Sequence, residues 1–275
     1  MTREGSSTPD YTMGFSEEYI AVLRRFTARR QAGYLLPYLR PGLRVLDFGC
    51  GPGTISVGLA RAVTPGEMHG IDMEESQIDL ARSLAEAGGN TNAIFHVGDV
   101  TDLPFEDNYF DVAHCHNVLM HVPDTETVLA EVMRVLKPGG IIGCSEMICG
   151  SSFTYADYGQ FSRAWGIFED ILVNDEGHPQ MGRELKTFIP KAGFENLKMS
   201  ASFDVYSTPE EVAFIYRLVQ QWFLSPEIME KAIEYGIATR RSFEDIRVSY
   251  DEWSVDPDAF LAVAYGEAVA NKPVP

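Results

Sequence analysis

The segment VLDFGCGPGT at residues 45–54 constrains this chain of 275 residues more than any other stretch. An apolar run ends in Asp47, glycines follow at positions 49, 51 and 53, and an amphipathic run covers residues 55–62. Buried parallel strands are apolar in this way, and glycine adopts backbone angles that other residues avoid. The first turn of a helix presents N–H groups that have no partner within the helix. The pattern therefore predicts strand, tight turn and helix, with a nucleotide-like cofactor at the carboxyl end of the strand.

The same alternation continues downstream and predicts an α/β fold. Further strands are expected at residues 66–73, 93–99, 110–117 and 141–147, with helices at 75–87 and 124–136. Strands that alternate with helices form a parallel sheet covered on both faces. Outside this core the patterns predict helices at 16–36, 153–172 and 183–192, a strand at 194–206, two or three helices over 208–254, and a last strand at 259–269.

Charge and composition exclude several classes of protein. The net charge of −18 opposes binding to nucleic acid, whose phosphates are also negative. The chain contains no apolar run of the roughly 20 residues needed to cross a bilayer, and its polar first ten residues do not resemble a secretory signal. None of the four cysteines forms a C-x-x-C pair, which favours reduced thiols over a zinc site. We therefore expect a cytoplasmic protein.

The spacing of the glycines separates the classes of cofactor. A dinucleotide-binding turn has the pattern G-x-G-x-x-G, but Thr54 occupies the position of its third glycine. A P-loop is excluded because no Gly-Lys-Ser/Thr follows. Asp72 and Asp99 end the second and third predicted strands. Carboxylates at these ends can accept hydrogen bonds from ribose hydroxyls and from an adenine amino group.

Five segments carry a resemblance to a known family: residues 45–54, 70–72, 98–100, 110–112 and 136–140. In this order they resemble the motifs of class I S-adenosylmethionine-dependent methyltransferases, of the small-molecule type similar to the ubiquinone/menaquinone-biosynthesis branch. The resemblance implies a Rossmann-like, seven-stranded, mostly parallel sheet with the last strand antiparallel, plus a helical cap insertion. The implied divisions are an N-terminal tail and helix that forms a cofactor lid (1–40), a cofactor-binding core (41–150), a cap insertion (151–193) and a part that completes sheet and cap (194–275).

The resemblance also implies a set of residues that bind S-adenosyl-L-methionine. Asp47 and its glycine turn would hold the methionine part, Asp72 the ribose and Asp99 the edge of the adenine. Tyr11, together with Phe15, would either cover the cofactor from the N-terminal tail or pack on the outside of the sheet. The full cofactor-binding set that we predict is Tyr11, Asp47, Gly49, Cys50, Gly51, Gly53, Asp72, Met73, Gln77, Gly98, Asp99, Val100, His116, Asn117 and Val118.

Catalytic and acceptor-binding residues follow less directly. His121 comes just after the fourth strand, where it is either a general base or a packing residue that caps the next helix. His114 and His116 share one face of their strand, but no third ligand converges on them, so no metal is expected. The region after the fifth strand either binds an apolar or planar acceptor or forms the core of the cap; its candidates are Glu146, Tyr155, Tyr158, Phe161, Trp165, His178, Met181 and Arg183.

The function that we expect is methyl transfer from S-adenosylmethionine to the oxygen, nitrogen or carbon of a small molecule. Quinone-like, phenolic, amine and carboxylate acceptors all remain open. Two alternatives are a nicotinamide-dependent oxidoreductase and a non-catalytic module that binds S-adenosylmethionine. The partners we expect are the methyl acceptor and, as an option, a second copy in a homodimer, but not nucleic acid.

Overall fold

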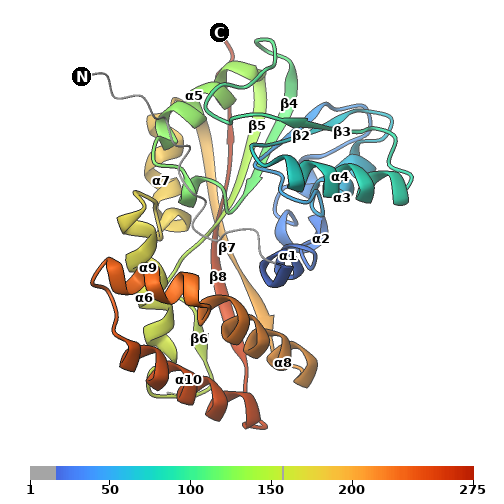
Figure 1. The fold of residues 1–275 in the computed structure, drawn as a ribbon. Helices are drawn as coiled ribbons and strands as arrows, with labels where there is room; N and C mark the ends of the chain where they lie inside the picture. Colours follow the sequence, from blue (N-terminus) through green and yellow to red (C-terminus); the bar gives the residue numbers. More distant parts are fainter. Residues whose placement is uncertain (1–16, 157) are drawn as a thin grey trace, which may run out of the picture.

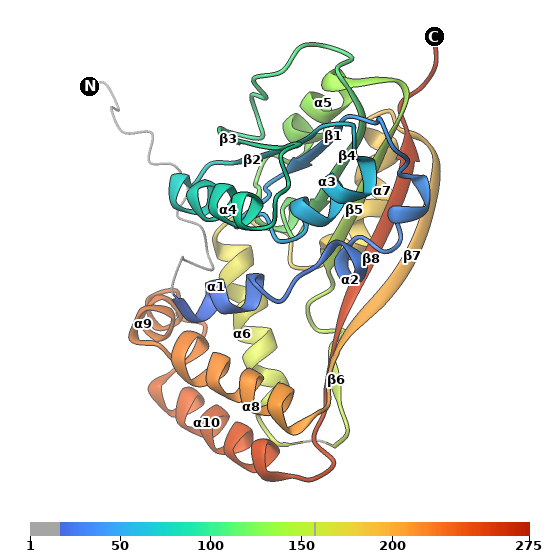
Figure 2. The same cartoon turned by 90° about the vertical axis from the view of Figure 1, so that its right-hand side faces the viewer.

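A single mixed sheet runs the length of the molecule (Figures 1 and 2). The structure is a computed structural model, which describes residues 17–156 and 158–275. Within these residues the sheet has eight strands: β1 (Val45–Phe48), β2 (Met68–Asp72), β3 (Ala93–Val97), β4 (Phe110–His116), β5 (Leu136–Met147), β6 (Phe153–Thr154), β7 (Glu195–Tyr206) and β8 (Leu261–Asn271).

The strand order confirms the predicted sheet. The order is β3-β2-β1-β4-β5-β8, and β7 pairs with β8 as well. The two-residue strand β6 pairs with residues 261–262 of β8, and β5 pairs with residues 265–271, so β6 extends the position of β5. Seven full strands remain. The pairs among β1 to β5 are parallel, whereas β8 is antiparallel to both β5 and β7.

Helices cover both faces of the sheet. Successive residues of a strand point to opposite faces: Val45 packs in a core with α3 and α4, whereas Leu46 packs in a second core with α5 and α7. The helices are α1 (Glu17–Leu23), α2 (Ala28–Gln31), η1 (Leu36–Tyr38), α3 (Ser56–Val63), α4 (Glu75–Ala87), η2 (Leu119–His121), α5 (Thr125–Val135), α6 (Phe161–Asn174), α7 (Met181–Lys191), α8 (Pro209–Leu218), η3 (Val219–Phe223), α9 (Pro226–Glu234) and α10 (Arg240–Val255).

Two predicted helices differ from the structure. The helix expected at residues 16–36 is interrupted, because Thr27 has an extended backbone and its hydroxyl caps α2 by accepting the N–H of Arg30. The helix expected at 153–172 begins only at Phe161, because Phe153 and Thr154 pair with β8. The core elements over residues 41–147 are confirmed to within a few residues, except that β5 begins at Leu136.

The long strands create a second level below the short ones. β7 and β8 continue past the ends of β1 to β4, and α6, α8, α9 and α10 gather against this extension (Figures 1 and 2). We call these four helices and η3 the cap. Helix α7 lies within the predicted cap insertion, but it packs on β5 and β8. The cap therefore comes from two separate parts of the chain, before and after β7.

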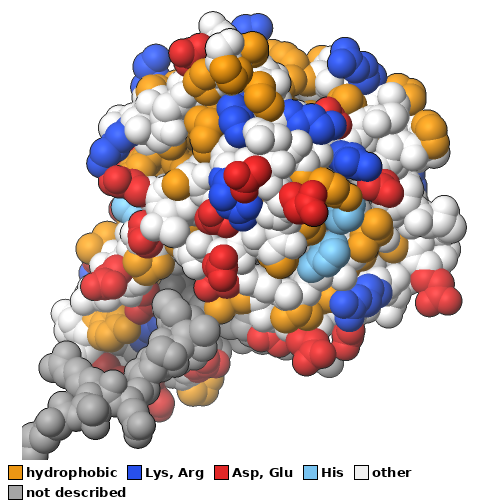
Figure 3. All heavy atoms as spheres, turned by 90° about the horizontal axis from the view of Figure 1, so that it is seen from above, with side chains coloured by type: hydrophobic (Ala, Val, Ile, Leu, Met, Phe, Trp, Pro, Cys, Tyr) orange, Lys and Arg blue, Asp and Glu red, His pale blue; other side chains and the backbone are white. Residues whose placement is uncertain are grey.

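The described residues show one further feature of the surface and one of the helices. Figure 3 looks onto the end of the molecule that is uppermost in Figure 1, and there basic and acidic side chains are interspersed rather than gathered by sign. No helix within residues 17–156 and 158–275 is long and apolar enough to cross a membrane.

A glycine pair allows α7 to approach the sheet closely. A Cβ atom built on Gly266 of β8 would overlap the backbone of Gly182 in α7, and one built on Gly182 would overlap the carbonyl of Glu146. The helix and the strand thus meet backbone to backbone, which only glycine permits here.

Glu146 fastens the turn that follows β4. This residue of β5 has no exposed surface. Its Oε1 accepts the N–H groups of Val118 and Leu119 at 3.1 and 3.0 Å, and its Oε2 accepts that of Met120 at 3.2 Å. Burial raises the pKa of this carboxyl to about 7, even though the three N–H groups favour its ionised form.

We predict that Gly266→Ala destabilises the protein by about 3 kcal/mol, because the new methyl group overpacks the contact between α7 and β8. Urea denaturation of both proteins measures this difference. The control is Gly166→Ala in α6, where the nearest atom to the new Cβ is the end of the flexible Arg163 side chain. That variant should be unchanged or up to about 1 kcal/mol more stable. Equal effects of the two substitutions would contradict the close approach.

We predict that Glu146→Gln removes a pH dependence of stability. The folded protein keeps the Glu146 proton up to about pH 7, whereas an unfolded glutamate releases it near pH 4.5. The wild-type free energy of unfolding should therefore fall by about 3 kcal/mol, relative to the variant, as the pH rises through this window. Comparison at each pH cancels the opposite slope from the buried His116 and His121, whose pKa values are lowered. A constant difference between the proteins would refute the raised pKa.

Candidate functional site

A cavity of about 450 Å³ lies at the carboxyl ends of the parallel strands. We call it the strand-end cavity. Its walls come from the turn after β1, the start of α4, the segments after β2, β3 and β4, and helix α1. Twelve residues of the predicted cofactor-binding set line it: Asp47, Gly49, Cys50, Gly51, Asp72, Met73, Gln77, Asp99, Val100, His116, Asn117 and Val118.

The glycine turn forms part of the cavity wall and is fixed by its own backbone. Gly49 and Gly51 have φ values of 68° and 50°, which favour glycine. The N–H groups of Gly49 and Cys50 both donate to the carbonyl of Ile71, at 2.8 and 3.0 Å. A Cβ on Gly49 would overlap the Val118 side chain. The turn is therefore anchored to β2, and glycine at position 49 lets Val118 pack directly against it.

Asp47 is more deeply engaged than its position in the motif indicates. Its side chain is 3% exposed. Its Oδ1 lies 2.7 Å from Nδ1 of His114, and its Oδ2 accepts the Ser56 hydroxyl at 2.5 Å. Each carboxylate oxygen has a second lone pair, so a contact from Asp47 to a ligand would be additional to these two bonds.

Asp72 and Asp99 stand at the ends of neighbouring strands with acceptor capacity to spare. Asp72 accepts the N–H groups of Gly51 at 2.8 Å and Glu74 at 3.1 Å, one on each oxygen, and its burial raises its pKa. Asp99 accepts the N–H of Thr101 at 2.8 Å. Beside them the Met73 side chain is 51% exposed on the cavity, an apolar surface that a ligand ring would cover.

Gln77 is the clearest sign that this cavity receives a polar ligand. Its side chain is 2% exposed, yet neither its Oε1 nor its Nε2 has a hydrogen-bond partner within the described residues. A buried amide without partners costs about 1–3 kcal/mol for each group. Because Gln77 lines the cavity, a ligand with both a donor and an acceptor can satisfy it.

The charges of the cavity select the kind of ligand. None of the described lining residues is lysine or arginine, whereas five are aspartates: Asp47, Asp72, Asp99, Asp124 and Asp175. Such a lining attracts a cation and repels the pyrophosphate of a dinucleotide. A ligand with a sulfonium, an amino group, a ribose and an adenine fits both this charge and the amide of Gln77.

The two histidines of the cavity are neutral near pH 7. Burial lowers the pKa of His116 to about 3 and that of His121 to about 4. His116 lies between two aromatic rings, with its centre 5.0 Å from that of Phe26 and 5.2 Å from that of Tyr265. Within the described residues no group of three or more His, Cys, Asp or Glu is placed to hold a metal ion.

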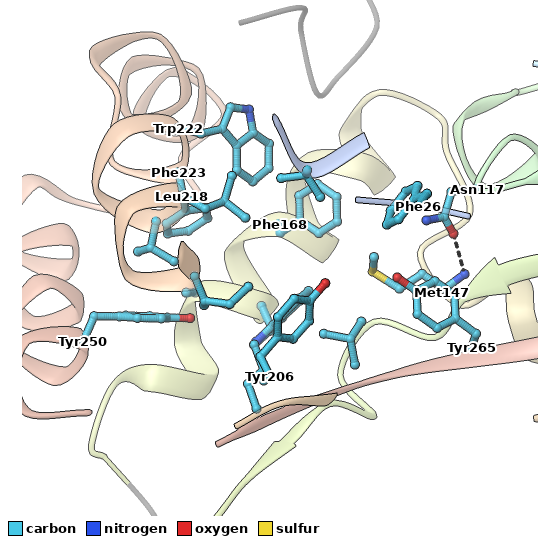
Figure 4. Close-up of a pocket in the computed structure, with 17 residues that line it drawn as sticks. Phe26, Asn117, Met147, Phe168, Tyr206, Leu218, Trp222, Phe223, Tyr250 and Tyr265 are labelled. Atoms are coloured by element: carbon cyan, nitrogen blue, oxygen red, sulfur yellow. Dashed lines mark hydrogen bonds between the residues drawn. The ribbon is translucent and has the colours of Figure 1, made fainter. Parts of the chain in front are cut away.

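A second cavity, of about 120 Å³, lies between the cap and the extended part of the sheet. We call it the cap cavity, and Figure 4 shows its walls. Phe26 and Asn117 line both cavities, so the two meet at these side chains. Asn117 has a φ of 54°, and its Oδ1 accepts the N–H of Met147 at 3.0 Å. This bond, drawn in Figure 4, holds Asn117 at the junction.

The structure places the predicted acceptor residues in different surroundings. Trp165 lines the cap cavity. The others line neither cavity: Glu146 holds the turn after β4, Tyr155 is 62% exposed, the Tyr158 hydroxyl donates to Asp256 at 2.9 Å, Phe161 stacks on Tyr250, His178 lies 3.2 Å from Glu184, Met181 is buried, and Arg183 bonds the Ser151 hydroxyl.

Three residues of the predicted cofactor set are not on the cavity wall of the described chain. Gly53 approaches Ala81 of α4, and Gly98 approaches Ile71, so both serve packing. Tyr11, like Phe15, lies outside the described residues.

Sequence reasoning missed most of the cap cavity. Its walls include Phe26 and aromatic residues of β7, η3 and β8, among them Tyr206, Trp222 and Tyr265. No local motif marks these positions. The only signal was the density of aromatic residues over 203–223, which a hydrophobic core also explains.

Comparisons with known proteins agree with this geometry. A family model described as a methyltransferase domain matches residues 39–205. An uncharacterised methyltransferase of Schizosaccharomyces pombe is 32% identical over 267 residues, which cover 93% of this chain and 94% of the relative. The demethylmenaquinone methyltransferase of Staphylococcus aureus is 39% identical over 109 residues, 39% of this chain and 44% of the relative.

A solved structure shows the same fold. Phosphoethanolamine N-methyltransferase 2 of Haemonchus contortus, in complex with phosphomonomethylethanolamine and S-adenosylhomocysteine, superposes with a TM-score of 0.54 and 18% identity. The match covers 88% of this chain and 52% of that one. With an acid-lined cavity at the strand ends and a family match over more than half of its length, the chain belongs to the class I S-adenosylmethionine-dependent methyltransferases, and S-adenosyl-L-methionine is its cofactor.

Proposed function

We propose that this enzyme methylates a small molecule which occupies the cap cavity while the cofactor occupies the strand-end cavity. The observation that carries the proposal is the meeting of the two cavities at Phe26 and Asn117. We propose that the methyl group passes from one cavity to the molecule in the other at this junction. Oxygen, nitrogen or carbon of a quinone-like, phenolic, amine or carboxylate metabolite is the proposed acceptor atom, and the cytoplasm is the proposed compartment.

The residues of the strand-end cavity divide the work of binding. We assign the ribose to Asp72, the adenine edge to Asp99 with Val100, and the unsatisfied amide of Gln77 to the polar groups near the ribose. Met73 would cover the adenine face. His116, Asn117 and Val118, at the end of β4 and the start of the turn fastened by Glu146, would hold the methionine end.

Positioning and exclusion of water are the proposed sources of the rate. When bound, the cofactor would supply an electrophilic methyl group on a sulfonium; the acceptor would bond to that carbon in line while the carbon–sulfur bond breaks and a neutral thioether leaves. Phe26 and Val118 exclude water from the junction, and a fixed approach raises the effective concentration of the acceptor. His121 is a weak base because its pKa is about 4, so we propose that it accepts a proton only as the acceptor becomes acidic during transfer.

We predict that Gln77→Leu raises the stability of the cofactor-free protein while it weakens cofactor binding. The leucine removes two buried polar atoms that have no partners, but it cannot bond the ligand. Thermal unfolding without ligand should shift upward, and calorimetry with S-adenosylhomocysteine should show a loss of affinity of about tenfold. Lower stability together with unchanged affinity would mean that Gln77 has a structural role instead.

We predict that the protein transfers label from methyl-labelled S-adenosylmethionine to a component of a small-molecule extract. Asp72→Asn should abolish most of the transfer, because an amide presents one acceptor oxygen where the carboxylate presents two. The matched control is Asp79→Asn on the exposed surface of α4, whose carboxylate pairs with Arg82 and does not line the cavity. This control should keep full transfer. Absence of transfer by the wild-type protein, with cofactor bound, would contradict the proposed function.

A further inference from the structure

We propose that the cap cavity selects an acceptor which is uncharged, elongated and largely apolar, with its one polar, reacting end at Asn117. This inference rests on the proposed function and narrows its four classes of acceptor to neutral molecules of the phenol or quinol kind. It excludes carboxylates and protonated amines.

The composition of the cavity wall carries the argument. None of the described residues that line the cap cavity is Asp, Glu, Lys, Arg or His, although five aspartates line the strand-end cavity beside it. A charged group without a counter-charge is strongly disfavoured in such surroundings, because it loses its hydration and gains no partner. The charge of a ligand therefore limits its binding in the cavity more strongly than its shape does.

The polar groups of the wall are themselves uncharged. Burial raises the pKa of Tyr206 to about 12 and also raises that of Tyr250, so both phenols keep their protons. Arg25 and Arg30 lie over the Tyr206 ring but do not line the cavity, and their charges are paired with Glu211 and Asp204. These hydroxyls and the Asn117 amide can bond a neutral hydroxyl or carbonyl, but they cannot neutralise an ion.

The one amide among the described wall residues lies at one end of the cavity. In Figure 4, Asn117, Phe26, Met147 and Tyr265 stand at one end, whereas Leu218, Trp222, Phe223 and Tyr250 stand at the other, with Phe168 and Tyr206 between. Because Phe26 and Asn117 also line the strand-end cavity, the reacting end of the acceptor must lie on their side. Its tail then extends toward Trp222 and Phe223.

The far wall is formed by an unusual turn. Helix α8 passes directly into η3, a π-helix over Val219–Phe223, and Val219, Trp222 and Phe223 all line the cavity. Single π-helical turns are frequent at functional sites. Because this turn directs three apolar side chains into one space, it supports a binding role for the cavity and not a defect in packing.

The volume of the cap cavity limits how much of the acceptor it can enclose. An apolar cavity of about 150 Å³ holds a benzene-sized molecule, and the cap cavity has about 120 Å³. One ring or a short chain thus fits within the cavity, and its reacting group projects to the junction.

The test uses three probes that share a 4-propylphenyl body and carry a neutral, a negative or a positive polar group: 4-propylphenol, 4-propylbenzoate and 4-propylbenzylammonium. Calorimetry on the full chain, saturated with S-adenosylhomocysteine, measures their affinities at pH 7. We expect the phenol to bind with a dissociation constant below about 1 mM and each ion to bind at least about tenfold more weakly. An ion that binds as tightly as the phenol, or a phenol that does not bind, overturns the inference.

A variant locates the binding. Ala164→Leu fills part of the cap cavity from α6 and should weaken phenol binding about tenfold, with S-adenosylhomocysteine affinity unchanged. Ala87→Leu on the exposed face of α4 is the matched control and should change neither. Retained S-adenosylhomocysteine binding shows that the variant folds. If it does not fold, the comparison of charges in the wild-type protein still decides.

The readouts separate this inference from the proposed function. Wild-type protein that binds S-adenosylhomocysteine, transfers label and prefers a charged probe disproves the selectivity alone. Wild-type protein that fails to transfer label to any small molecule disproves the proposed function itself.

Discussion

The buried Glu146 accepts three consecutive N–H groups, and these hydrogen bonds hold the two halves of the site together. The carboxylate belongs to β5, whereas the N–H groups belong to the turn after β4. That turn carries Val118 and follows Asn117, and both face the strand-end cavity. Because Asn117 is also bonded to Met147 of β5, the junction of the cavities is fixed at two points. The proposed relative position of cofactor and acceptor therefore depends on the hydrogen bonds between β5 and the turn after β4.

The two cavities differ in the property that governs binding. The strand-end cavity is acidic and contains an unsatisfied amide, so it favours a ligand with positive charge and many hydrogen-bonding groups. The cap cavity has an uncharged wall among its described residues, so it gains most from the removal of apolar surface from water. Under the proposed function, their separation would let one enzyme bind a charged cofactor and an uncharged acceptor without competition between them.

How much the sequence predicted follows from how local each feature is. The glycine turn, Asp72 and Asp99 are recognisable because a turn between a strand and a helix needs particular residues at fixed spacing. The engagement of Asp47 by His114 was not predictable, because it depends on the register between β1 and β4. The cap cavity was hidden for the same reason. Its wall joins Phe26 to Tyr265, residues far apart in the chain, and an aromatic residue there has the same local pattern as one in a solid core.

The π-helical turn of η3 has a consequence for how acceptor preference can change between relatives. A π-helix contains one residue more than the α-helix that would replace it. Deletion of a single residue within Val219–Phe223 would restore α-helical geometry, and the residues after the turn would keep nearly the same direction because the π-turn had accommodated the extra residue. The deletion would remove or redirect one of the side chains that this turn places on the wall of the cap cavity, and it would lie outside the strand-end cavity. Under the proposed function, insertions and deletions at this turn would change the acceptor preference on an unchanged cofactor-binding scaffold.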